Sequence, residues 1–296
     1  MPAETATLPA AQAGTLTLGG DLTVNRMGYG AMRITGKGIW GPPEDRNAAL
    51  ATLRRAVELG VNFIDTADSY GPDVSEELIA EALAPYPAGL VIATKVGWTR
   101  HGAGIWQHNA SPSHIAQAIE GSLKRLRLER IDIYQLHVPD PATSFDASME
   151  AIARLKEQGK VRHVALSNVT LEHIQRAQKI VPIVSVQNRY SFSDREWDYV
   201  VDYCEANGVA FMPWGPMAQG RKANEVIEKI AANRNTSTAV ISLAWLLRRS
   251  PVMLLIPGTS SVKHVEENIG AAGFKLTDEE FAELNAVVPK PYTLRG

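Results

Sequence analysis

The sequence predicts an α/β fold, a (β/α)8 TIM barrel preceded by an N-terminal β-hairpin and accompanied by two extra helices. The chain has 296 residues, and such a barrel needs about 250. Short apolar runs alternate eight times with helical patterns. Runs such as residues 91–94 also lack a strict alternation of apolar and polar residues, as expected when both faces of a strand are covered. These observations favour a closed barrel over an open doubly wound sheet.

The predicted elements follow one another in regular order. A hairpin pairs residues 15–18 with residues 22–25 around a Gly-Gly-Asp turn. The predicted barrel strands span residues 27–30, 63–65, 90–95, 131–137, 161–167, 183–188, 209–214 and 252–257. The predicted helices between and after them span residues 46–59, 75–83, 113–126, 145–158, 171–180, 195–207, 238–249 and 262–270. The two extra helices are predicted at residues 224–233 and 277–287.

Turn and cap residues support these boundaries. Gly60, Gly159 and Gly208 each stand between a predicted helix and a strand, where a left-handed C-cap favours glycine. Thr277 has Glu280 three residues later, which is typical of a capping box at a helix start. Residues 1–13 are rich in alanine and have no basic segment, so we expect a flexible tail there and one barrel domain over residues 14–296.

The composition argues against several classes of protein. The chain has 30 basic and 32 acidic residues with no block of like charge, so neither nucleic acid nor a membrane is an expected partner. No run approaches the roughly 20 apolar residues that span a bilayer, and the expected location is the cytoplasm. The one cysteine, Cys204, allows neither an intramolecular disulfide nor a Cys-based zinc cluster. The oligomeric state stays open.

Four side chains capable of acid–base chemistry fall at the ends of successive predicted strands. Asp65, Lys95 and His137 each close an apolar run, and Tyr70 lies on the loop that follows Asp65. Parallel barrel strands direct their carboxyl ends to one face, where active sites lie. Each residue alone is as readily a helix cap, a solvated charge or a packing group. Their joint position predicts an active site.

These four groups suit the reduction of a carbonyl compound. A phenol has a pKa of about 10, too high for an effective proton donor and acceptor at neutral pH. An ammonium group from Lys95 is expected to lower the pKa of Tyr70, and Asp65 is expected to hold Lys95 charged. An imidazole N–H from His137 can bind and orient the carbonyl oxygen. The hypothesis makes Tyr70 the proton donor.

Two other chemistries use parts of the same set. The histidines are scattered and form no His-Glu-x-x-His motif, and His101 and His108 have no supporting carboxylates nearby in sequence, so no metal is predicted. Lys95 is a possible Schiff-base amine of a lyase or isomerase. Asp65 nearby would keep that amine protonated, which argues against this role.

Polar or aromatic residues also end the later strands. Ser167, Asn168 and Gln187 carry donors and acceptors that suit a carboxamide such as that of nicotinamide, although they also suit loop capping. Trp214 can stack on a flat ring or plug the barrel top. Residues 258–261 lead into a helix start, which suits a phosphate or a simple helix cap.

The helix that follows this segment has polar residues that fit an adenosine phosphate. Lys263 and, when protonated, His264 add positive charge that would suit a 2′-phosphate. Glu267 and Asn268 lie on the same helix and can reach an adenine amino group.

Together these residues resemble the signatures of the aldo-keto reductases. The resemblance rests on residues 63–71 (FIDTADSYG), Thr94-Lys95, Leu136-His137, Ser167-Asn168, Gln187, Ile256-Pro257 and residues 266–268 (EEN). It covers the chain from Leu16 to the final helix and implies an eight-stranded barrel with an N-terminal hairpin at its base. It also implies an extended NADPH across the top, hydride transfer from nicotinamide C4, and a catalytic tetrad of Asp65, Tyr70, Lys95 and His137.

The resemblance further implies a set of cofactor contacts. They are expected at Gly30, Ala31, Met32, Asp65, Ser167, Asn168, Gln187, Trp214, Gly215, Pro216, Met217, Gly220, Pro257, Gly258, Thr259, Ser260, Ser261, His264, Glu267 and Asn268. Many members of the family carry a Lys-Ser pair and a downstream Arg in the 2′-phosphate loop. This chain has Gly258-Thr259 and His264 there, so NADPH is the expected cofactor and NADH the alternative.

The expected substrate is a small carbonyl compound. The chain also resembles a bacterial subgroup that includes pyridoxal reductases, which implies pyridoxal or another aromatic aldehyde. This resemblance rests on residues 27–32, 41–43, Asp65 with residues 70–72, and residues 256–262. Trp40, Trp98 and Trp106 lie on loops after the first and third strands and are predicted to line the substrate pocket with Tyr70 and His137. Each tryptophan equally suits packing its loop against the barrel. Potassium-channel β-subunits also resemble the family, so a cofactor-binding regulatory module is the alternative function.

Overall fold

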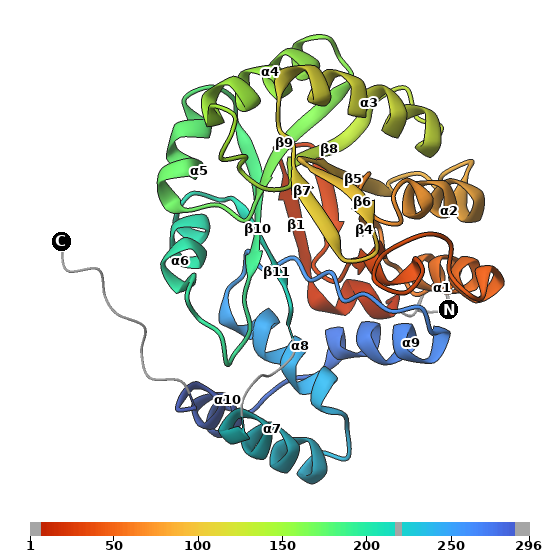
Figure 1. Cartoon of the computed structure of the whole chain (residues 1–296). Helices are drawn as coiled ribbons and strands as arrows, with labels where there is room; N and C mark the ends of the chain where they lie inside the picture. The colour runs from red at the N-terminus through yellow and green to blue at the C-terminus, as the bar shows by residue number, and fades with distance from the viewer. Residues whose placement is uncertain (1–6, 217–220, 288–296) are drawn as a thin grey trace, which may run out of the picture.

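The structure, a computed structural model, describes residues 7–216 and 221–287. Its centre is a curled sheet of seven parallel strands surrounded by helices, as a (β/α)8 barrel requires (Figure 1). In spatial order the strands are β3 (Tyr29–Gly30), β4 (Phe63–Asp65), β5 (Val91–Val96), β8 (Ile131–Leu136), β9 (Val161–Ser167), β10 (Ile183–Arg189) and β11 (Ala210–Trp214).

Helices follow most of these strands and lie outside the sheet (Figure 1). They are α1 (Arg46–Glu58), α2 (Val74–Leu83), α3 (Pro112–Leu126), α4 (Phe145–Glu157), α5 (Leu171–Gln178), α6 (Asp198–Ala206), α8 (Thr238–Arg249) and α9 (Val262–Gly270). Two further helices, α7 (Arg221–Asn233) and α10 (Asp278–Asn285), lie beside each other at the rim of the molecule and are joined by the ion pair Lys229–Glu283. Short 3-10 helices span Pro9–Ala13, Ala31–Ile34 and Ala271–Gly273.

The two edges of the sheet are joined by residues 252–257. Leu254 N donates to Phe211 O of β11 at 2.9 Å, and Gly28 N donates to Leu255 O at 2.8 Å. The expected eighth strand is therefore an extended segment that makes isolated bridges to Met27 and Phe211, and no regular strand forms there. Proline at positions 251 and 257 removes backbone donors at both ends of the segment, which shortens any ladder. The expected first strand is also shorter and begins at Tyr29.

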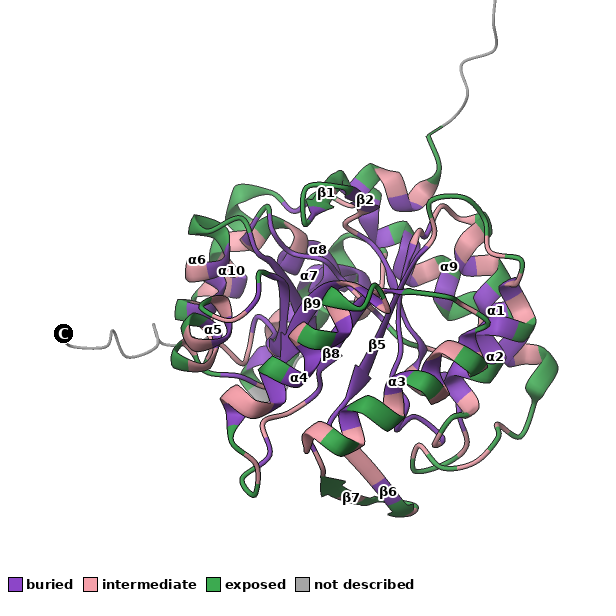
Figure 2. Ribbon diagram, turned by 90° about the horizontal axis from the view of Figure 1, so that it is seen from above, coloured by how far each residue is buried: buried purple, intermediate pink, exposed green. Residues whose placement is uncertain are grey.

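The sheet is buried on both faces (Figure 2). One apolar cluster lies between the strands and the helices, and a second, smaller cluster fills the inside of the curl. The inner cluster includes Leu18, Leu22 and Val24 from a hairpin of β1 (Thr15–Leu18) and β2 (Leu22–Asn25), which pair antiparallel. Burial on both faces explains why the strand sequences do not alternate between apolar and polar residues.

Two further local structures differ from the sequence predictions. The loop after β5 contains a second hairpin, β6 (Trp98–Gly102) and β7 (Ile105–His108), at the end of the sheet opposite β1 and β2 (Figure 2). Its strands are rich in polar and aromatic residues, so no apolar run signalled them. Residues 9–13 do not behave as the expected flexible tail. They form a 3-10 helix in which Ala10 is fully buried and its N–H donates to Leu59 O.

Candidate active site

The predicted acid–base residues meet at the carboxyl end of the sheet. Asp65 is the last residue of β4, Lys95 lies near the end of β5, and His137 directly follows β8. Tyr70 lies on the loop between β4 and α2, and Gly71 after it has φ of 103°, a backbone angle that favours glycine. At most 7% of the surface of any of these four residues is exposed.

Lys95 is the centre of the cluster. Its Nζ donates to Asp65 Oδ2 at 2.6 Å, to Thr66 O at 2.9 Å and to Tyr70 Oη at 3.3 Å. The three donors of the ammonium group therefore each have an acceptor, which offsets the cost of burying the charge. The rings of Tyr70 and His137 meet edge to face with centroids 5.7 Å apart. The phenol, ammonium and imidazole thus surround one small volume.

The second oxygen of Asp65 accepts from two amides. Gln135 Nε2 donates to Oδ1 at 2.7 Å, and Gln187 Nε2 donates to it at 3.1 Å. Gln187 was expected to bind a carboxamide, and here its side chain lies on Asp65. Gln135 was not predicted. Gln135 pairs in register with Lys95 and lies two residues before His137, so its side chain is on the same face of the strand as His137. A polar residue at that position in an apolar strand could have identified it as part of the site.

Burial and charge set the protonation states of the cluster. Burial raises the pKa of Tyr70 above its ordinary value, and the charge of Lys95 opposes this rise without cancelling it. Lys95 therefore lowers the pKa of Tyr70 as predicted, but burial has the larger effect and the pKa is raised overall. Burial disfavours a charged Lys95, but Asp65 and Tyr70 raise its pKa above the usual value. Burial, with a smaller contribution from Lys95, holds the pKa of His137 well below its usual range, so His137 is neutral at neutral pH.

The later strand ends form a second polar wall. Ser167 ends β9, and Asn168 after it adopts φ of 55°. Asn168 Nδ2 donates to His137 O at 3.0 Å, and Trp214 Nε1 donates to Asn168 Oδ1 at 3.1 Å. Trp214 ends β11 with 40% of its surface exposed, so Asn168 links its indole to the histidine. Gly215 and Pro216 follow, whereas the predicted contacts Met217 and Gly220 lie outside the described residues.

The predicted phosphate segment lies beside β3. A Cβ placed on Gly258 would come within 2.6 Å of Gly30 O, and one on Gly30 within 2.5 Å of Ile256 O, so both glycines permit a close backbone approach. Thr259 O accepts from the Tyr29 hydroxyl, which fixes the segment to the barrel.

The other predicted contacts lie on the elements that leave this junction. Ala31 and Met32 begin the 3-10 helix after β3. The segment from Pro257 through Ser260 continues to Ser261, the N-cap of α9, which makes no side-chain cap hydrogen bond. Lys263 and His264 are exposed in the first turn of α9, Glu267 is half-buried, and Asn268 is buried.

The three predicted tryptophans gather around the mouth of the site. The ring centroid of Trp98 lies 6.5 Å from that of His137 and 5.8 Å from that of Trp106. Trp40 forms a bridge with Gly71, next to Tyr70, and 38% of its surface is exposed. The expected loop residues are thus close to the phenol and the imidazole.

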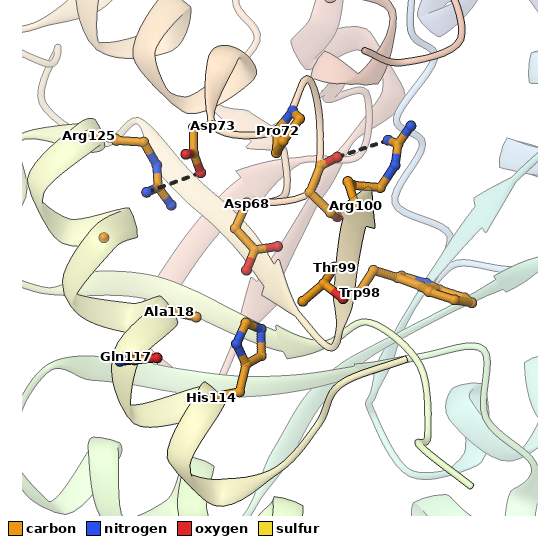
Figure 3. A pocket seen from close by; sticks show the side chains of 12 residues that line it. Asp68, Pro72, Asp73, Trp98, Thr99, Arg100, His114, Gln117, Ala118 and Arg125 are labelled. Carbon is orange, nitrogen blue, oxygen red and sulfur yellow. Dashed lines mark hydrogen bonds and ion pairs between the residues drawn. The ribbon is translucent and has the colours of Figure 1, made fainter. Parts of the chain in front are cut away.

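A pocket of about 420 Å³, lined mainly by polar and charged residues, adjoins this site (Figure 3). It lies between the loop that carries Tyr70, the start of β6 and helix α3, and none of the four predicted catalytic residues lines it. Asp68 Oδ1, Ser69 Oγ and His114 Nε2 are buried at its wall without a hydrogen-bond partner among the described residues. Burial raises the pKa of Asp68 well above its usual range, and Glu76 adds to the rise.

Residues 7–216 and 221–287 contain neither a metal-ligand group nor a membrane-spanning helix. No group of three or more His, Cys, Asp or Glu side chains in these ranges is placed to hold a metal ion. None of the helices described has the length and apolar character needed to cross a membrane.

The barrel and the cluster define a class of oxidoreductase, and the comparisons with known proteins name it. Residues 26–289 match the aldo/keto reductase family. An uncharacterized oxidoreductase of Schizosaccharomyces pombe is 48% identical over 285 residues, which cover 96% of this chain and 92% of the relative. Pyridoxine 4-dehydrogenase of Escherichia coli is 41% identical over 280 residues, which cover 92% of this chain and 98% of that enzyme.

Solved structures agree with this assignment. Glycerol dehydrogenase from Gluconobacter oxydans superposes with a TM-score of 0.83 at 26% identity, covering 95% of this chain and 98% of that chain. An aldo/keto reductase from Klebsiella pneumoniae in complex with NADP and acetate gives a TM-score of 0.78 at 26% identity, covering 94% and 96%. The chain belongs to the aldo/keto reductase family. It is an NAD(P)H-dependent oxidoreductase.

Proposed function

We propose that the protein reduces an aldehyde or ketone to the alcohol with NADPH, and that Tyr70 delivers the proton. The observation that carries the proposal is the contact of Lys95 Nζ with both Asp65 and the Tyr70 hydroxyl in a buried cluster. The charge of Lys95 favours the phenolate, so it makes Tyr70 a stronger acid than burial alone would allow. Neutral His137 can donate an N–H to the same carbonyl oxygen.

The residues at the barrel mouth fit an extended nicotinamide dinucleotide. Trp214 offers a half-exposed indole whose position is fixed by Asn168, as ring stacking requires. Gly30 and Gly258 let the backbone approach closely at the other end. Ser261 does not cap α9 with its side chain, which leaves the first N–H groups of the helix for a phosphate. When bound, the cofactor would supply a hydride to the carbonyl carbon.

The remaining proposed contacts follow from these anchors. Ser167, Asn168 and Gln187 would hold the carboxamide, and Glu267 and Asn268 would meet the adenine. Lys263 and His264 are exposed in the first turn of α9 and would meet a 2′-phosphate, which favours NADPH over NADH. We also expect a cytoplasmic location.

An aromatic aldehyde such as pyridoxal is the proposed substrate. Support comes from the 41% identity to pyridoxine 4-dehydrogenase of Escherichia coli and from the tryptophans near His137 and Gly71. Flat apolar walls around a few fixed polar groups suit such a compound. If the protein binds the cofactor but turns over no carbonyl compound, we would infer a cofactor-binding regulatory module in place of a reductase.

The test compares wild-type protein with Tyr70→Phe. We expect the wild type to oxidise NADPH with pyridoxal or benzaldehyde, and Tyr70→Phe to lose a factor of about 10² to 10⁴ in kcat while its NADPH affinity persists. Tyr134→Phe is the matched control, because this buried hydroxyl has no partner among the described residues. Turnover by Tyr70→Phe at the wild-type rate would refute the assigned proton donor.

A further inference from the structure

Arg100 is a buried cation that binds backbone carbonyls. It lies in β6 with 8% of its surface exposed. Its guanidinium makes five hydrogen bonds, to the carbonyl oxygens of Gly38, Ile39, Ser69, Gly102 and Ile105, at 2.8 to 3.4 Å. Within the described chain no carboxylate forms an ion pair with it. The planar guanidinium presents donors in several fixed directions, and here they hold backbone from separate segments.

The carbonyls belong to three loops at the mouth of the site. Gly38 and Ile39 lie on the loop that follows the 3-10 helix Ala31–Ile34. Ser69 lies on the loop between β4 and α2, and Gly102 and Ile105 belong to the β6–β7 hairpin. The bond from Arg100 Nη1 to Ser69 O, at 3.1 Å, reaches the residue directly before Tyr70. Arg100 therefore connects segments that have little regular secondary structure to fix them against one another.

Three of these carbonyls immediately precede an aromatic residue of the site. Ile39 precedes Trp40, Ser69 precedes Tyr70, and Ile105 precedes Trp106. The guanidinium carbon also lies 3.7 Å from the ring centroid of Trp106 and 5.7 Å from that of Trp40. One side chain thus fixes both the peptide groups before these residues and two of the rings themselves.

From this arrangement we propose that Arg100 determines substrate selectivity by setting the separation of Trp40, Trp106 and Tyr70. The inference rests on the proposed reductase function and adds a residue that holds the walls of its substrate site. Arg100 is a positioning residue in this role. Without the guanidinium the three loops would separate. A flat aromatic aldehyde would then lose contacts with the tryptophan rings that a small aliphatic aldehyde never makes.

The experiment uses Arg100→Lys and Arg100→Met. Lysine keeps the charge but cannot bind five carbonyls spread over three loops, and methionine keeps a similar unbranched stem without the charge. Activity is measured with benzaldehyde and with propanal at saturating NADPH, together with the NADPH dissociation constant and Tm. We expect the ratio of kcat/KM for benzaldehyde to that for propanal to fall about tenfold. The change should lie mainly in KM for benzaldehyde, with NADPH affinity unchanged.

Arg26→Lys is the matched control. Arg26 also binds backbone carbonyls, those of Ala13, Leu247, Ser250 and Met253, but beside the segment that precedes β3. A general loss of stability would lower Tm in both lysine variants, whereas selectivity should change in Arg100→Lys alone. An unchanged ratio in both Arg100 variants, or an equal change in Arg26→Lys, would overturn the inference. If the wild type reduces neither aldehyde, the proposed function falls and this inference falls with it.

Discussion

Asp65 divides its two oxygens between a cation and two amides. Oδ2 accepts from Lys95, while Oδ1 accepts from Gln135 and Gln187. In the proposed function Gln187 also binds the carboxamide of the cofactor. Gln135 is fully buried and has no such alternative partner in the described structure, so it is the more constant donor to Asp65. Gln135 therefore helps to hold Asp65 in place, and Asp65 in turn holds Lys95 against the hydroxyl of Tyr70.

Gln135→Leu tests this support. The substitution removes a hydrogen bond to a charged group, worth about 1.5 to 3 kcal/mol, and leaves a side chain of similar size. We expect kcat to fall by about tenfold or more because Lys95 is held less firmly against Tyr70. Gln178→Leu is the control, because Gln178 accepts from Tyr203 on the outer helices. Steady-state kinetics with equal kcat in wild type and Gln135→Leu would contradict the role.

The charge of Lys95 should be visible in the pH profile of alcohol oxidation. Oxidation requires Tyr70 to accept a proton, so its rate rises with pH as the phenol ionises. Burial raises the pKa of Tyr70 and Lys95 lowers it. Lys95→Met removes the lowering effect, so the rising limb should move to higher pH. Because the pKa of His137 is far below its usual value, no inflection from this residue is expected near neutral pH.

This measurement needs a stability check. Lys95→Met leaves Asp65 buried without its cation, which is strongly destabilising, so Tm is recorded for each variant. A limb that stays in place or moves to lower pH in a folded Lys95→Met protein would show that Lys95 does not tune the phenol.

The junction between β3 and the segment before α9 depends on backbone contact. A Cβ on Gly258 would lie 2.6 Å from Gly30 O, a backbone atom that cannot move aside alone, whereas a Cβ on Gly270 would meet no atom within 4 Å. Gly258→Ala should therefore lower the free energy of unfolding by about 1 to 3 kcal/mol and weaken NADPH binding. Gly270→Ala, near the end of α9, should be neutral or stabilising.

Thermal unfolding and a fluorescence titration with NADPH measure both effects. If Gly258→Ala binds NADPH as tightly as wild type while Tm falls, the junction supports the fold and has no part in the cofactor site.

The elements were predicted best where the residue type changes abruptly along the chain, as at a glycine after a helix or a charged residue after an apolar run. The left-handed glycines Gly60, Gly159 and Gly208 have φ of 92°, 77° and 63°, as their positions after helices indicated. Asp65 and Lys95 were recognisable because each ends an apolar run. A regular eighth strand was predicted at residues 252–257, where the structure has only isolated bridges. An apolar run shows hydrophobicity but does not show whether its backbone pairs continuously with its neighbours.

Contacts made through the backbone were beyond sequence reasoning. Arg100 binds carbonyl groups, which every residue possesses, so no partner could be identified from residue types. Gln135 was missed because a single polar residue in a buried strand is usually interpreted as a local exception. The net rise in the pKa of Tyr70 depends on the depth of its burial, which follows from packing of distant segments.

Cofactor binding should stabilise the protein as a whole. The proposed contacts come from strands and segments across the chain, from Gly30 to Asn268, so a bound dinucleotide would favour the folded state over the unfolded one. At a free concentration of 100 times its dissociation constant, a ligand adds about 2.7 kcal/mol. We expect NADPH to raise Tm more than NADH at equal concentration, because Lys263 and His264 stand at the start of α9. A larger shift with NADH would reverse the proposed preference.

The bridge made by residues 252–257 also has a consequence during synthesis. Until those residues leave the ribosome, β3 and β11 present bare hydrogen-bonding edges, and bare edges invite pairing with other polypeptides. We therefore expect the nascent chain to be exposed to such pairing until residues 252–257 have emerged and joined β3 to β11.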